Sequence, residues 1–197
     1  MFNKKFNLIL IACFILFYSL SFGQSGTGSN SSKVKTNSGI IFQKESENRI
    51  SDSSYTDVIQ LFGLTEKAQA IQFRILINKS TDDKNILIFK GIQKGSDIID
   101  SAWLLEFNVI KGKVVKDGAS QDEIFVLLYN SNLDGGLLPG DYTDLIDIKY
   151  QVAKLPDNQN NIKSSIKISN AEASTFDGNA INVTPSRDEF IIYIDKK

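Results

Sequence analysis

Apolar and polar residues alternate with a period of two along much of this chain. Residues 70–78 read AIQFRILIN, so that Ile71, Phe73 and every second residue after them share one face. The same alternation returns in residues 146–152 and in residues 165–169. Successive side chains of a β-strand point to opposite faces of its sheet. The pattern therefore predicts antiparallel strands with one face on a core and the other face in water.

Shorter apolar runs, rich in β-branched and aromatic residues, complete the set of predicted strands. They comprise residues 86–89, 104–110, 124–129 and 190–194. Turn sequences bound them, among them Lys-Gly-Lys at 111–113, Asp-Gly-Gly at 134–136 and Pro-Gly-Asp at 139–141. Eight or nine short strands emerge, and no long amphipathic helix. We predict an all-β fold, an antiparallel two-sheet sandwich with jelly-roll or Greek-key connections.

The first 24 residues have the layout of a secretory signal peptide. Lys4 and Lys5 precede an apolar run from Leu8 to Phe22, and small and polar residues follow near Gly23. The run is about 15 residues long, shorter than the roughly 20 residues that a membrane-spanning helix needs. We expect residues 1–24 to be removed and the mature chain to have no membrane span. The protein is then secreted, or held at the cell surface or in the periplasm.

Cys13, the only cysteine, lies inside this apolar run. Residues 10–13 read LIAC, which fits the loose pattern of a bacterial lipoprotein box and would place a lipid on Cys13. Most of the run follows the cysteine, whereas a lipoprotein cysteine comes at the end of such a run. Export without a lipid is the preferred interpretation, and lipidation of Cys13 stays open as the alternative.

Residues 25–54 separate the leader from the main set of predicted strands. Residues 25–37 read SGTGSNSSKVKTN and offer almost nothing to bury, which is typical of a flexible linker. Residues 39–42 (GIIF) have the composition of an edge strand, but polar residues surround them. We predict a flexible linker over residues 25–54 and one domain over residues 55–197, long enough to bury a single core.

The composition excludes several kinds of chemistry. The chain has no histidine, and its one cysteine leaves with the leader. The mature chain then lacks the groups for a Ser-His-Asp or Cys-His triad, for a thiol nucleophile and for a His/Cys zinc site. The 22 basic and 23 acidic residues are scattered, without the basic face that nucleic-acid binding requires. We expect no enzyme, no nucleic-acid partner and no cofactor, with calcium as the one alternative.

The calcium alternative rests on a loop at residues 130–141, which approximates the spacing of an EF-hand. Asn130, Asn132, Asp134 and Asp141 stand at loop positions 1, 3, 5 and 12, and Gly135 stands at position 6. Oxygen ligands at this spacing wrap around a hard cation. The flanking segments alternate as strands rather than helices, and Asn, Asp and Gly also favour ordinary turns. A turn is the preferred interpretation of this loop.

Exposed aromatic side chains are the candidates for stacking against sugar rings. Trp103, the only tryptophan, opens an apolar run, where a core position is the commoner explanation. Tyr142 follows Pro139 and Gly140 in a predicted turn and is the better candidate for exposure. A single tryptophan argues against a strong carbohydrate-binding platform without removing the possibility.

The order of segments resembles that of cohesin domains. Residues 67–78 are similar to the early cohesin strand that carries a glutamine between large apolar residues. Residues 86–98 resemble the segment that leads to a glycine, here Gly95, and residues 122–132 resemble an apolar strand before a loop. Residues 164–194 are similar to the closing pattern of a strand, an Asx/Ala-rich turn, Asp-Gly and a final strand. The resemblance extends over roughly residues 55–195 and implies a cohesin-like sandwich.

This resemblance implies a secreted, non-catalytic module that binds a protein, which for cohesins is a dockerin module on another secreted protein. Such binding requires a partly apolar sheet face with a polar border, about 800 Å² per partner. The sequence alone leaves open which face that is. Two other functions stay open: a carbohydrate-binding module of a secreted polysaccharide-degrading system, and an adhesion subunit whose sheet edges pair with neighbours.

Overall fold

The computed structural model describes residues 38–78, 86–99, 102–114, 120–132, 134–159, 161–187 and 189–197. The predicted signal peptide, the Cys13 alternative and the first half of the predicted linker lie outside these residues. The described part contains eleven strands and one 3-10 turn, η1 (Ser96–Ile98). The strands are β1 (Ser38–Phe42), β2 (Ser46–Ile50), β3 (Ser53–Leu64), β4 (Ala70–Asn78), β5 (Leu87–Lys94), β6 (Trp103–Val114), β7 (Ser120–Asn130), β8 (Gly140–Val152), β9 (Ile162–Ser174), β10 (Ala180–Arg187) and β11 (Glu189–Asp195). The predicted all-β class is confirmed.

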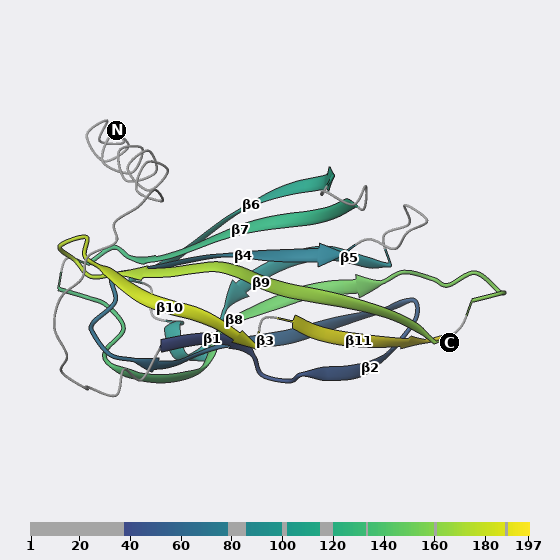
Figure 1. Cartoon of the computed structure of the whole chain (residues 1–197), viewed down its shortest axis with the longest axis horizontal. Coiled ribbons are helices and arrows are strands. Elements are labelled where there is room, and N and C mark those ends of the chain that lie inside the picture. Colours follow the sequence, from purple (N-terminus) through teal and green to yellow (C-terminus); the bar gives the residue numbers. More distant parts are fainter. Residues whose placement is uncertain are drawn as a thin grey trace, which may run out of the picture. The chain divides into compact units, whose positions relative to one another are not determined.

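The strands form two sheets (Figure 1). The first sheet has the order β5-β8-β3-β1-β10, and the second has the order β6-β7-β4-β9, continued by β11 and β2. Neighbours are antiparallel except for β1 with β10 and β2 with β11. Strand β10 links the sheets, because Ala180–Asn182 pair with β9 whereas the register with β1 begins at Val183.

Alternating side chains of the two sheets meet in one core. Ile71, Phe73, Ile75 and Ile77 of β4 are almost fully buried, while the residues between them are only partly buried. Aromatic pairs join the sheets near their edges, with ring centroids 5.4 Å apart for Phe42 and Phe190 and 5.8 Å apart for Phe89 and Phe107. Truncation of a buried phenylalanine to alanine typically costs about 3–5 kcal/mol, so this core dominates the stability of the sandwich.

The predicted domain boundary at residue 55 is wrong, because the sandwich already includes residues 38–54. Ile40 and Phe42 of β1 are at most 1% exposed, and β1 lies between β3 and β10 in the first sheet. Strand β2 reads SENRI and lies at a sheet edge with β11 as its partner. An edge strand needs few apolar residues, so its sequence looks like a linker.

No helix in the described part of the chain is long and apolar enough to cross a membrane.

Candidate functional site

The outer face of the second sheet exposes apolar side chains between polar ones. This face is formed by alternate residues of β6, β7, β4 and β9, whose other residues enter the core. Its members are Leu104, Glu106, Asn108 and Ile110 of β6, Glu123, Phe125, Leu127 and Tyr129 of β7, Gln72, Arg74 and Leu76 of β4, and Lys167, Ser169 and Glu172 of β9. In the rest of this article "the outer face" means this set.

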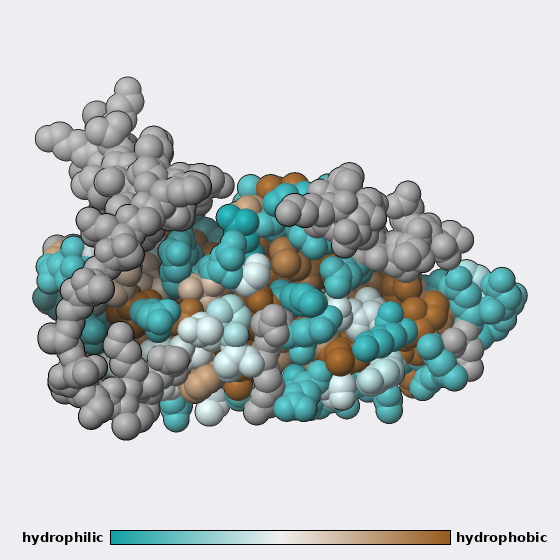
Figure 2. Space-filling model, viewed as in Figure 1, coloured by the Kyte–Doolittle hydropathy of each residue, from teal (hydrophilic) through white to brown (hydrophobic). Residues whose placement is uncertain are grey.

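Leu104, near the start of β6, and Ile110, in its second half, are 40% and 41% exposed. Opposite β6, the outward residues of β7 are half-buried and include Phe125, Leu127 and Tyr129. The other sheet differs in exposure: its outward positions carry Thr56, Gln60, Lys149 and Gln151 together with apolar residues such as Val58 and Phe62, which are half-buried. None of the large, exposed apolar side chains found in the described residues lies on that side. Figure 2 shows apolar residues reaching the surface at separate places among polar ones.

A charged cluster lies at the end of the outer face where Glu123 pairs with Ile110 and Leu76. Glu123 is only 2% exposed and accepts a hydrogen bond from Arg74 Nη1 at 2.9 Å on one carboxylate oxygen. Its second oxygen accepts a hydrogen bond from Lys113 Nζ. The Arg74 guanidinium also lies 4.6 Å from the centroid of the Phe125 ring. Two cations around one carboxylate leave an excess positive charge, held in a fixed position at the surface.

Polar contacts border this cluster. Tyr129 donates its hydroxyl to Glu106 Oε1 at 3.0 Å, and Gln72 Nε2 donates to Glu172 Oε2 at 2.9 Å. Burial and the Glu106 carboxylate raise the pKa of Tyr129, so its hydroxyl stays a donor at neutral pH. Apolar side chains with fixed polar neighbours are the composition found where proteins bind one another.

The two aromatic candidates from the sequence do not form an exposed platform. Trp103 points into the core from the start of β6 and is 4% exposed. This is the core position that the sequence favoured, and carbohydrate binding through Trp103 or Tyr142 stays a prediction. Tyr142 is half-buried at the start of β8 and donates its hydroxyl to the carbonyl oxygen of Leu138 at 2.8 Å.

The four calcium candidates lie at the β7–β8 connection, where several of their oxygens accept hydrogen bonds from the protein. Asn130 Oδ1 accepts the backbone N–H of Asn132 at 2.9 Å, and Asp141 Oδ1 accepts that of Gly63 at 2.7 Å. The carbonyl oxygen of Asp134 accepts a hydrogen bond from Lys67 Nζ. This is turn and loop geometry. Within the described residues no three His, Cys, Asp or Glu side chains gather as a metal site. Calcium binding by these residues stays a prediction.

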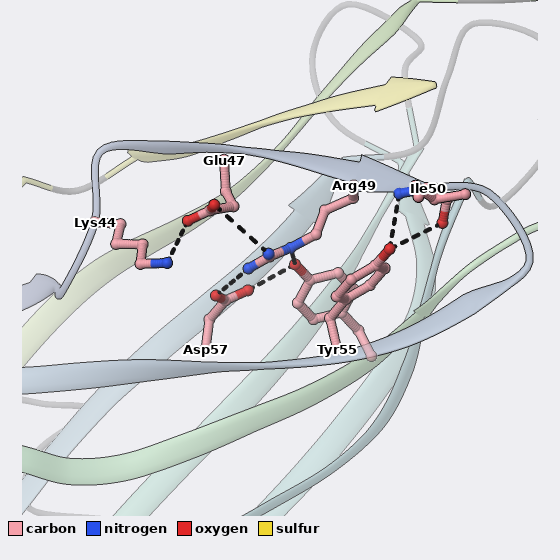
Figure 3. A network of polar contacts seen from close by, with 7 residues as sticks. Lys44, Glu47, Arg49, Ile50, Tyr55 and Asp57 are labelled. Carbon is pink, nitrogen blue, oxygen red and sulfur yellow. Dashed lines mark hydrogen bonds and ion pairs between the residues drawn. The ribbon is translucent and has the colours of Figure 1, made fainter. Parts of the chain in front are cut away.

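Sequence reasoning missed a polar network between the sheets (Figure 3). Arg49 of β2 donates from Nη2 to Asp57 Oδ1 at 2.6 Å and from Nε to the hydroxyl of Tyr150 at 3.2 Å. Tyr150 in turn donates to Asp57 Oδ2 at 2.6 Å. Burial, followed by the Asp57 carboxylate, raises the pKa of Tyr150. Lys44 and Glu47 pair beside Arg49, so the network has two cations and two carboxylates.

A hollow of about 170 Å³ adjoins the network and is lined by Phe42, Gln43, Lys44, Arg49, Thr56, Asp57, Val58 and Phe190. Its charged lining residues already pair with one another, and the lining contains no activated nucleophile. The network therefore joins β2 to the first sheet and has no evident chemistry. The sequence holds one hint of this network. Asp57 is a charged residue at an inward position of the alternating pattern of β3.

Comparisons with known proteins place the fold. No family model matches the chain, and no curated protein matches it. Among solved structures, a chain of a type I cohesin–dockerin complex from Clostridium thermocellum has a TM-score of 0.59 and 15% identity, and the match covers 89% of this chain and 100% of that one. The sixth cohesin of scaffoldin B from Acetivibrio cellulolyticus, in complex with a dockerin, has a TM-score of 0.57 and 14% identity, with 81% and 100% covered. A type I cohesin from Pseudobacteroides cellulosolvens has a TM-score of 0.54 and 10% identity, with 82% and 94% covered. The described domain therefore has the cohesin fold that the order of its segments predicted.

Proposed function

We infer that this chain is a non-catalytic protein-binding module and that its partner, a dockerin-type module of another secreted protein, binds the outer face. The observation that carries the inference is the difference between the two sheets. The outer face presents the exposed Leu104 and Ile110 beside the half-buried aromatic and aliphatic side chains of β7, whereas the outward apolar residues of the first sheet, such as Val58 and Phe62, are all half-buried. The solved structures with this fold, in complexes with dockerins, support the type of partner.

The outer face also defines the chemistry of the partner. Leu76, Phe125 and Leu127 offer apolar contact on neighbouring strands. The side chains of Arg74 and Lys113 are 30% and 46% exposed while they hold Glu123, so they can also donate hydrogen bonds to a carboxylate or hydroxyl of a partner. The partner surface is therefore apolar, with acidic or hydroxyl groups placed over the Glu123 end of the outer face.

The remaining sequence fits this role. Residues 25–197 contain no histidine and no cysteine, which a binding module does not need. The leader of residues 1–24 places such a module outside the cytoplasm, where secreted partners are found. We propose secretion or retention at the cell surface, with lipidation of Cys13 as the alternative route to the surface.

The test uses the exported chain as bait in the secreted fraction of its own organism, with and without a calcium chelator. A captured partner is then purified, and its Kd is measured by calorimetry with two matched variants. Leu127→Lys places a cation on the outer face opposite Glu106, a pairing that the sheet tolerates. Val58→Lys makes the matched change on the outward side of the first sheet, where an apolar residue lies opposite a carboxylate, that of Asp147.

We expect Leu127→Lys to weaken binding at least tenfold and Val58→Lys to leave it within twofold. A partner with paired Asp/Asn-rich calcium loops, lost with the chelator, supports a dockerin-type module. Equal binding by both variants rules out the outer face. Retention by polysaccharide alone, without a protein partner, replaces the proposed function with a carbohydrate-binding module.

A further inference from the structure

Three of the four edges of the described sheets are protected against pairing with another strand. In the first sheet, edge strand β5 is interrupted by an irregularity between Phe89 and Gly91, and edge strand β10 contains Pro185. In the second sheet, edge strand β2 has five residues, of which four are polar. Bulges, proline, short length and charge are the usual means by which proteins block sheet edges.

Strand β6 is the fourth edge, and over residues 104–110 it has no register shift and no proline, with Glu106 as its one charged residue. It pairs with β7, and no described strand lies on its other side. Leu104, Phe107 and Ile110 make it the strand richest in large, exposed apolar residues among those described. Its ends are closed: Lys94 Nζ donates to the carbonyl oxygen of Trp103 at 2.9 Å, and the register with β7 shifts between Ile110 and Lys113.

We propose that β6 of one chain pairs antiparallel with β6 of a second copy, about a two-fold axis at Phe107. This register sets Leu104 opposite Ile110 of the second copy, and Leu105 opposite Val109. Phe107 then faces its own counterpart, and Glu106 faces Asn108. All three exposed apolar residues of the strand gain apolar partners, and cross-strand apolar pairs of this kind stabilise antiparallel sheets.

Neighbouring registers are less favourable. A two-fold axis at Glu106 sets this carboxylate opposite its own counterpart, and like charges in direct opposition destabilise a sheet. An axis at Asn108 sets Glu106 opposite Ile110. A register that sets an odd-numbered residue of one copy opposite an even-numbered residue of the other places the outward side chains of one copy beside the inward side chains of the other. The sequence of β6 is therefore self-complementary in one register, which identifies the occupant of the edge as a second copy.

The dimer has a defined geometry and strength. The two second sheets join into one sheet, and the two outer faces lie on the same side of it. An antiparallel two-fold contact uses the same edge of both copies, so the assembly closes at two chains. Seven residue pairs along one edge bury less than a standard interface, so the dimer is weak and depends on concentration. The inference is independent of the partner proposed above, because it needs only the edge of β6.

Cysteine cross-linking tests the register. The variants are made in a Cys13→Ser background, so that the introduced thiol is the only one in the chain. Directly opposite Cα atoms of antiparallel strands lie about 4.5–5.5 Å apart, within the range that a disulfide bridges. Phe107→Cys should therefore form a covalent dimer on mild oxidation. Leu105→Cys is the matched control, since the two copies of residue 105 lie about four residues apart along the strands, roughly 13 Å.

We expect Leu105→Cys alone to stay monomeric, and a mixture of Leu105→Cys with Val109→Cys to form the mixed disulfide. Sedimentation of the uncross-linked chain should show the monomer mass rising to the dimer mass with concentration. Phe107→Lys should abolish this rise, and Phe176→Lys, an equally drastic change at another exposed phenylalanine, should leave it unchanged. A chain that stays monomeric, or cross-linking as efficient at residue 105 as at residue 107, overturns the proposal. The cysteine series decides the case even if Phe107→Lys does not fold.

Discussion

Replacement of Arg49 by methionine is expected to destabilise the domain by about 3 kcal/mol. The side chains of Arg49 and Asp57 are 12% and 10% exposed, and Arg49 Nη2 lies 2.6 Å from Asp57 Oδ1. Methionine retains an apolar chain of similar length, so the change removes the charge and its hydrogen bonds while most of the packing remains. The carboxylate of Asp57 is then left in the interior without a cation.

The magnitude follows from what Asp57 keeps. Loss of one partner of a buried ion pair typically costs about 3–5 kcal/mol, because the other charge stays buried and uncompensated. Asp57 still accepts the hydrogen bond from the Tyr150 hydroxyl, which places the expected cost at the lower end of that range. In the double variant Arg49→Met/Asp57→Asn no charge remains to be compensated. Its cost should fall short of the sum of the two single costs by about 1–3 kcal/mol.

The assay is reversible unfolding in urea, with the free energy of unfolding compared among the wild type, the two single variants and the double variant. Lys44→Met is the control, because Lys44 belongs to the same network but is exposed and pairs with the exposed Glu47. We expect it to change stability little. A loss below about 1 kcal/mol for Arg49→Met, or strict additivity in the double variant, would refute the reasoning that this network holds β2 against the first sheet.

Two further predictions concern the same domain. Burial and the Asp57 carboxylate raise the pKa of Tyr150 above its ordinary value of 10.0. As the pH rises, this hydroxyl therefore loses its proton at a lower pH in the unfolded chain than in the folded domain. Stability should therefore fall above pH 10 by about 1.4 kcal/mol per pH unit from this residue, and Tyr150→Phe should lack that part of the slope in urea unfolding at pH 8–11. Gly95→Ala should cost about 1–3 kcal/mol, because its Cβ would lie 2.1 Å from the backbone oxygen of Asp144. Gly39→Ala, whose Cβ would meet only the outer atoms of the Phe62 ring, should lower the melting temperature less.

The fold was predictable where local pattern and tertiary structure agree. The alternation in residues 70–78 gives the bounds of β4 and its buried face, because this strand has one side on the core. The cohesin-like order of segments also proved correct, since the spacing of strands and turns fixes which strands become neighbours.

Residues 39–42 were considered as an edge strand but assigned to the linker, and β2 was not predicted, because each strand contributes in a way that the local sequence does not show. Strand β1 has five residues and pairs with two strands. One is β3, which follows β2 along the chain, and the other is β10, which lies near the C-terminal end of the chain. The inward position of Arg49 on β2 depends on Asp57 and Tyr150, and the latter is 101 residues away. Only the tertiary structure shows that these polar groups satisfy one another in the interior.

The location of the outer face has a signal in the sequence that the two-sheet prediction did not use. In β4 and β8 polar residues alternate with apolar ones, as expected when one side of a strand faces water. Residues 124–129 read IFVLLY and are apolar on both sides, a pattern otherwise typical of strands covered on both faces. In the structure only the Ile124 side of β7 meets the core, and the Phe125 side lies on the outer face. A strand that is apolar on both sides but covered on one supports the proposal that a partner completes the burial at this face, and β6 with Leu104 and Ile110 extends the face to an edge at which no described strand pairs.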